Sequence, residues 1–118
     1  MFGIPDWFAI LFALVFILFD FITGLIKALK NKNISSQIMR EGLFHKVGFV
    51  LTIALSIFCE TAIEHIELSF NMPLVIPVCT YIVLTELASI LENLAEISPE
   101  LKQTNILKLF ENVKENKK

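Results

Sequence analysis

Three long apolar segments separated by short polar ones dominate the pattern of this 118-residue chain. The segments cover about residues 7–29, 46–65 and 72–93. A helix of about 20 residues rises about 30 Å, which matches the apolar core of a bilayer. We therefore expect an all-α integral membrane protein with three transmembrane helices in one domain, residues 1–118. Pro77, one turn into the third segment, is expected to bend that helix.

The polar segments predict two further helical elements. Residues 33–44 are too polar to cross a membrane, and Ser35 or Ser36 can cap a short helix there. This helix would form an interfacial elbow between the first two spans. Ser98-Pro99-Glu100 is typical of a helix start, so we expect residues 98–118 to form an amphipathic cytoplasmic helix.

The distribution of basic residues predicts the topology. From the end of the first span to the start of the second, only one acid, Glu41, opposes a group of bases, namely Lys27, Lys30, Lys32, Arg40 and Lys46. Loops rich in Lys and Arg usually remain in the cytoplasm. The N-terminus, which carries Asp6 and no Lys or Arg before the first span, is then outside. Three spans bring the Lys-rich C-terminus inside.

Composition agrees with a membrane protein and excludes several functions. The chain is 55% hydrophobic with a mean hydropathy of +0.69, and its net charge of −2 offers no basic surface for nucleic acid. No nucleophile with an adjacent base, phosphate loop or zinc spacing occurs, so we expect neither an enzyme nor a cofactor. One group at the end of the second span could suggest a metal site, but carboxylates with one His there are more often solvated, so no metal is expected. That group is Glu60, Glu64, His65 and Glu67.

Polar residues within the three spans recur at helical spacing. On the first span they are spaced i, i+3, i+4 and i+7, on the second mainly i+4, and on the third i, i+3 and i+7. Each span therefore carries a polar stripe, as in helices that meet one another or line water. Small residues on the second span would also let another backbone approach closely. The candidate assembly or pore-lining residues are Asp20, Thr23, Gly24, Lys27, Gly48, Thr52, Ser56, Glu60, Glu86, Ser89, Glu92 and Asn93.

Two interpretations of the charged residues remain open. Asp20 and Lys27 could form a stripe that faces a pore on assembly, or Lys27 could reach the cytoplasmic interface while Asp20 bonds to a neighbouring helix. The intramembrane acids Asp20, Glu60 and Glu86 outnumber the intramembrane bases. At least one of these acids is therefore expected to be protonated, exposed to water or paired across subunits.

Four motifs, in this order, carry a resemblance to a known family. They are Asp20-Phe-Ile-Thr23-Gly24-Leu-Ile-Lys27-Ala28, Ile34-Ser35-Ser36, Gly42-Leu-Phe-His45-Lys46 and Glu86-Leu-Ala-Ser89-Ile90-Leu-Glu92-Asn93. From Asp20 to about Pro99 the chain resembles the toxin-secretion/phage-lysis holin family, small three-span proteins of phages of Gram-positive bacteria and of clostridial toxin loci. The resemblance implies a homo-oligomer that opens a lesion in the bacterial cytoplasmic membrane. An endolysin or a signal-less toxin would leave through it as cargo, without stable binding.

Three alternatives differ in what crosses the membrane. An antiholin or regulatory partner would co-assemble without opening, and a passive assembly subunit would accumulate harmlessly. A small cation or proton channel or transporter subunit would use Asp20, Glu60 and Glu86 for ion passage. Such a channel would be ion-selective, whereas a holin lesion passes folded proteins indifferently.

Overall fold

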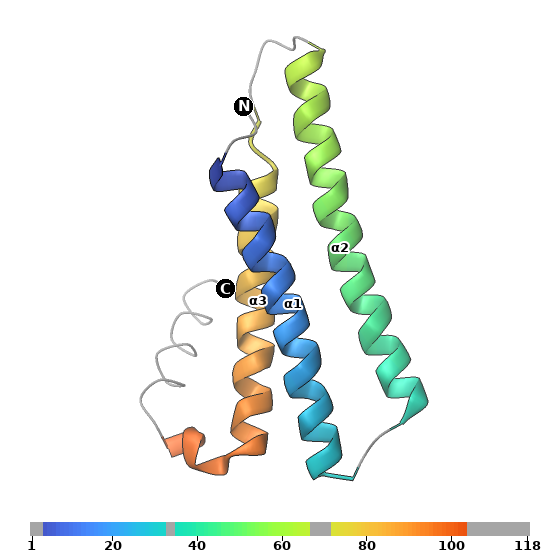
Figure 1. The fold of residues 1–118 in the computed structure, drawn as a ribbon, viewed down its shortest axis with the longest axis vertical. Coiled ribbons are helices and arrows are strands. Elements are labelled where there is room, and N and C mark those ends of the chain that lie inside the picture. Colours follow the sequence, from blue (N-terminus) through green and yellow to red (C-terminus); the bar gives the residue numbers. More distant parts are fainter. Residues whose placement is uncertain (1–3, 33–34, 67–71, 104–118) are drawn as a thin grey trace.

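The computed structural model describes residues 4–32, 35–66 and 72–103. It contains three long helices, α1 (Ile4–Lys30), α2 (Ser36–His65) and α3 (Val75–Ile97), followed by the short 3₁₀ helix η1 (Pro99–Gln103). Each long helix has the length and hydropathy needed to cross a membrane. The expected all-α protein with three transmembrane helices is therefore confirmed. In Figure 1, α1 and α3 run in the same direction and α2 runs in the opposite one.

The core lies mainly between α1 and α3, which cross side by side in Figure 1. Ala13 of α1 is fully buried in the same apolar cluster as α3 residues, and small side chains let two helices approach closely. The buried apolar cluster consists of Ile10, Ala13, Ile17, Ile53, Val75, Cys79 and Ile82. Most other apolar side chains on the three helices point outward, as expected where the surroundings are lipid.

Helix α2 packs less extensively than α3. Of its 30 residues only Ile53, Ser56 and Glu60 are buried, whereas α3 has seven buried residues among 23. Two of the three buried α2 side chains are polar. The position of α2 therefore depends on polar contacts to an unusual degree for a membrane helix.

The start of α2 differs from the expectation that its span begins near residue 46. The helix is continuous from Ser36, so the residues expected to form a separate elbow are instead its first turns. Ser35 is the N-cap, and its hydroxyl accepts a 3.5 Å hydrogen bond from the amide of Ile38. No proline interrupts the next 30 residues, and charged residues such as Arg40 and Glu41 are good helix formers. The charged residues before residue 46 limited the predicted membrane span, but they do not interrupt helix α2.

Both ends of α3 also differ from the predicted segment. The helix begins at Val75, so Pro77 falls in the first turn, where a missing amide hydrogen removes no helical hydrogen bond. At the other end, Lys30 Nζ of α1 donates to the carbonyl oxygens of Glu96 and Ile97 at 2.8 and 3.0 Å. A cation at a helix C-terminus is favourable there. The expected start at Ser98-Pro99 appears as η1, while residues 104–118 of the predicted tail helix lie outside the described residues.

Candidate functional site

A lysine of α2 lies between carboxylates of the other two helices, within the membrane-spanning part of the bundle. Lys46 Nζ is 2.6 Å from Asp20 Oδ2 on α1 and 2.9 Å from Glu86 Oε2 on α3. The side chains are nearly buried, with exposed fractions of 12% for Lys46, 10% for Asp20 and 2% for Glu86. Because one ammonium group contacts both carboxylates, Lys46 connects all three helices.

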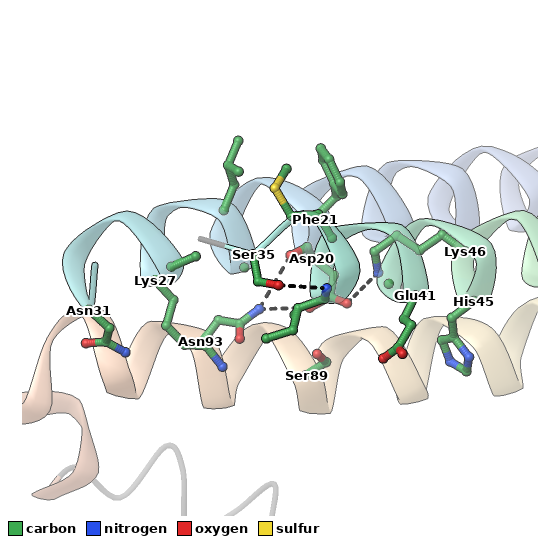
Figure 2. A pocket seen from close by; sticks show the side chains of 16 residues that line it. Asp20, Phe21, Lys27, Asn31, Ser35, Glu41, His45, Lys46, Ser89 and Asn93 are labelled. Carbon is green, nitrogen blue, oxygen red and sulfur yellow. Dashed lines mark hydrogen bonds and ion pairs between the residues drawn. The ribbon is translucent and has the colours of Figure 1, made fainter. Parts of the chain in front are cut away.

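Asn93 extends this network on the opposite side of Asp20. Its Nδ2 donates to Asp20 Oδ1 at 3.0 Å (Figure 2). The same Nδ2 donates to Thr23 Oγ1 at 3.1 Å. The Thr23 hydroxyl in turn donates toward the backbone carbonyls of Phe19 and Asp20 within its own helix. Asp20 and Thr23 are one turn apart on α1, and Glu86 and Asn93 two turns apart on α3, so each pair shares one helix face.

The network lowers the free-energy cost of placing charged side chains in a bilayer. A single Asp or Lys at the centre of a transmembrane helix costs on the order of 3 kcal/mol on an insertion scale. Here Asp20 and Glu86 share Lys46, and Asn93 adds an amide donor to Asp20. Within the part of the chain that the structure describes, no buried side-chain nitrogen or oxygen lacks a hydrogen-bond partner. If all three groups are ionised, one negative charge remains unmatched.

A partly open cavity of about 610 Å³ adjoins the network where α1 ends and α2 begins. Figure 2 shows Asp20, Lys46 and Asn93 at this cavity, with Lys27, Asn31 and Ser35 along it. Its walls combine polar groups with apolar ones such as Phe21 and Met39. The cavity extends from Asp20 and Lys46 to Lys27 and Asn31. Its lining residues are Asp20, Phe21, Gly24, Leu25, Lys27, Ala28, Asn31, Ser35, Ile38, Met39, Glu41, Gly42, His45, Lys46, Ser89 and Asn93.

A second polar contact attaches the other end of α2 to α3. Glu60 Oε1 accepts hydrogen bonds from the backbone amides of Leu74 at 2.8 Å and Val75 at 3.4 Å. These amides lie at the start of α3, where unpaired N–H groups and the helix dipole favour a negative charge. Glu60 is only 7% exposed, so the contact is formed away from the surroundings. For Glu60, the partner that an acid within the membrane requires is the N-terminus of α3.

The acidic end of the bundle contains a smaller cavity of about 260 Å³. Asp6, Glu60 and Glu64 line it together with Met72, Pro73 and other apolar residues. Across residues 4–32, 35–66 and 72–103, no group of three or more His, Cys, Asp or Glu side chains is arranged to hold a metal ion. Glu67, the remaining acid of the suspected metal group, lies outside the described residues.

The structure brings some of the candidate residues together and separates others. Asp20, Thr23, Glu86 and Asn93 meet in the network, and Gly24, Lys27 and Ser89 line its cavity. On α2 the polar residues divide between two sides. Ser56 and Glu60 are buried, but Gly48 and Thr52 are exposed, as is Glu92 on α3.

The i+4 spacing explains why the α2 residues do not share one face. Each residue of an α-helix turns about 100°, so a step of four residues drifts by about 40° around the axis. Over the twelve residues from Gly48 to Glu60 this drift reaches about 120°. The inward face instead follows Lys46, Phe49, Ile53, Ser56 and Glu60, which alternate steps of three and four.

Lys46 is the network residue that the sequence reasoning missed. It was assigned to the basic loop between the first two spans, because a charge at the edge of an apolar run usually marks the membrane interface. The signal that could have identified it is its place in the three-and-four pattern that continues through Ile53 and Ser56. The spatial partners, 26 and 40 residues away in the chain, carry no local sequence signal.

Comparison with known proteins gives one match, to a protein family. No curated protein and no solved structure matches the chain significantly. The sequence does match the bacteriophage holin family over residues 1–115, which includes all three membrane helices and every residue of the network. The chain therefore belongs to the bacteriophage holin family.

Proposed function

We propose that the protein homo-oligomerises in the bacterial cytoplasmic membrane and opens a lesion that releases an endolysin or a signal-less toxin. Family membership supports a non-enzymatic holin role in the inner membrane in general terms. The observation that carries the finer proposal is the buried contact of Lys46 with Asp20 and Glu86. An anchor in lipid requires no such network, and its charges are costly there, so their presence favours a function that uses them.

These inward polar groups would become lumen-lining groups when the helices separate during assembly. A closed three-helix unit keeps Asp20, Lys46, Glu86 and Asn93 paired, which permits accumulation in the membrane without leakage. Opening the unit would place the same side chains against water, where their charges are no longer costly. A water-filled lesion would then be lined by groups that already exist in the closed unit.

The proposed orientation places the N-terminus outside and the C-terminus in the cytoplasm. At the end of the bundle where α2 begins, the described residues include Lys27, Lys30, Lys32 and Arg40. At the opposite end they include Asp6, Glu60 and Glu64, with no Lys or Arg among residues 4–10, 58–66 and 72–80. This asymmetry supports the orientation through the preference of basic segments for the cytoplasm.

A cation or proton channel is the second candidate, because the two cavities carry acids at opposite ends of the bundle. Asp20 lines the larger cavity, and Asp6 and Glu60 line the smaller one. The apolar cluster around Ala13 and Ile53 lies between these polar ends. In the closed unit that cluster would block ions, so a channel would also need a rearrangement of the helices.

Inducible expression beside a cytoplasmic endolysin that lacks a signal peptide tests the proposal. We expect growth to continue during a lag and then turbidity to fall abruptly, with a cytosolic marker enzyme in the medium. Cells without the endolysin should lose viability but keep their shape. Loss of ion gradients with the marker retained would support the channel, and harmless accumulation in the membrane would support an antiholin, a regulatory partner or a passive assembly subunit.

A further inference from the structure

The attachment of α2 to the rest of the bundle depends on a polar contact near each end. Toward the start of α2, Lys46 contacts Asp20 and Glu86, and toward its end Glu60 accepts from the amides that begin α3. Between these points Ile53 and Ser56 are buried, and Phe49 and Ile57 are half-buried against the apolar cluster. The Ser56 hydroxyl bonds within α2, to the carbonyl of Ile53 at 2.7 Å. Moving α2 away from α1 and α3 would therefore expose fewer buried side chains than moving α3.

The polar contacts restrict where α2 can move more than its apolar packing does. In a bilayer, Lys46 and Glu60 cannot leave their partners for lipid, because an unpaired charge there is costly. Before a lesion admits water, they can leave only for equivalent partners. A second copy of the chain supplies the same partners. Its Asp20 and Glu86 carboxylates can contact Lys46, and the amides at the start of its α3 can donate to Glu60. Exchange of an identical element between copies is a low-cost route to oligomers for this reason.

We propose that α2 exchanges between copies during assembly, so that Lys46 of one copy contacts Asp20 and Glu86 of a second copy. Glu60 of the same α2 then accepts from the start of α3 in that second copy. The inference rests on the proposed homo-oligomeric function and deepens it by naming the surface that oligomerises. This surface is the face of α1 and α3 that α2 covers in the closed unit, defined by Asp20, Glu86 and the amides of Leu74 and Val75.

Chain length permits the exchange. Residues 31–35 separate α1 from α2, and residues 66–74 separate α2 from α3. Fully extended, five and nine residues can span about 17 and 30 Å, at about 3.4 Å per residue. Neighbouring helix axes lie about 8–10 Å apart. Both connections can therefore reach an adjacent copy. If α2 of each copy packs on the next copy, and the exchange is not reciprocal between two copies, the oligomer closes into a ring or continues to grow.

Complementation between two inactive variants tests the exchange. The first variant, Asp20→Asn with Glu86→Gln, keeps Lys46 but lacks its acceptors. The second, Lys46→Met, keeps both acids but lacks the lysine. Each alone should fail to lyse cells that carry the endolysin. Expressed together, they should restore lysis, because Lys46 of the first can contact the acids of the second. In the matched control, the first variant also carries Lys46→Met, and no lysis should return when it is expressed with the second variant.

Crosslinking provides a second measurement that does not depend on lysis. In a background with Cys59→Ala and Cys79→Ala, one copy carries Ile53→Cys and one epitope tag, and the other carries Ile17→Cys and a different tag. Both side chains belong to the buried apolar cluster, so Lys46, Asp20 and Glu86 stay unaltered. A short thiol crosslinker applied to membranes should yield a dimer that carries both tags. The control places both cysteines on one of two differently tagged copies, so that contacts within a chain yield crosslinked monomers.

The outcomes separate the exchange from the proposed function. Restored lysis or a dimer with both tags supports the exchange. If amine crosslinking shows that the unaltered protein forms oligomers but the cysteine pair joins only residues of the same chain, the exchange is wrong and homo-oligomerisation stands. If the unaltered protein neither forms oligomers nor lyses cells, both proposals fail.

Discussion

Lys46 Nζ lies 2.6 Å from Asp20 Oδ2, which joins the second membrane helix to the first across 26 residues of sequence. The same ammonium group contacts Glu86 on the third helix at 2.9 Å. The contact provides the cation that the acids of a membrane bundle require, and within a single chain it favours the interpretation in which Asp20 bonds to a neighbouring helix. It therefore joins the three helices of the closed unit.

Removing the lysine should destabilise the closed unit more than removing the whole network. Lys46→Met leaves Asp20 and Glu86 buried without their cation, and breaking a buried ion pair costs about 3–5 kcal/mol. Adding Asp20→Asn and Glu86→Gln should recover part of this loss, because a buried neutral amide costs less free energy than a buried unpaired carboxylate. Unfolding of the purified protein in detergent or bicelles measures both effects. Equal stability of the single and triple variants would show that the charges are not coupled.

Loss of Asn93 should loosen the contact between α1 and α3. Its amide donates to the Asp20 carboxylate and to the Thr23 hydroxyl, so Asn93→Leu leaves a buried acceptor with fewer partners. We expect a cost of about 1–3 kcal/mol in the free energy of unfolding. Tyr81→Phe, at an exposed position of the same helix, is the control and should change stability little. Equal effects of the two substitutions would argue against the network.

The acids should be needed for the lesion and not for insertion. Glu86→Leu removes a carboxylate that contacts Lys46, and Glu60→Leu removes the acceptor at the start of α3. Both variants become more apolar, so both should still enter the membrane. Endolysin-dependent lysis should be lost. The check is a comparison of lysis time with the amount of protein in the membrane fraction, and normal lysis by both variants would contradict the role given to these acids.

Gly48 tests whether the exposed side of α2 is also a contact surface. A Cβ atom at Gly48 meets nothing within 4 Å, so Gly48→Ala causes no clash in the closed unit. The higher helix propensity of Ala should stabilise α2 by about 0.5–1 kcal/mol. If another copy packs closely against Gly48 and Thr52, the bulkier Gly48→Leu should delay or abolish lysis while the monomer remains folded. Unchanged lysis timing in Gly48→Leu would exclude this side of α2 from the assembly.

The amino-acid sequence was sufficient to predict the three spans, because long apolar runs have few other stable structures. The sequence did not predict that α2 begins at Ser36. Charged residues keep a segment out of lipid, but they do not prevent it from being helical. The inward side of α2 was also misjudged, because an i+4 row drifts around the axis and leaves Gly48 and Thr52 exposed. The pairing of Lys46 depends on how three helices pack, so hydropathy could mark the acids as needing partners but could not name the partner.

Size-graded release from vesicles is the most direct test of the central claim, that this chain alone opens a protein-sized lesion. Purified protein would be added to phospholipid vesicles that contain both a small dye and a folded marker enzyme. The account predicts that the dye and the enzyme escape together above a threshold protein density, and that Glu86→Leu abolishes the release of both. Escape of the dye with complete retention of the enzyme would contradict the account and indicate an ion-sized channel.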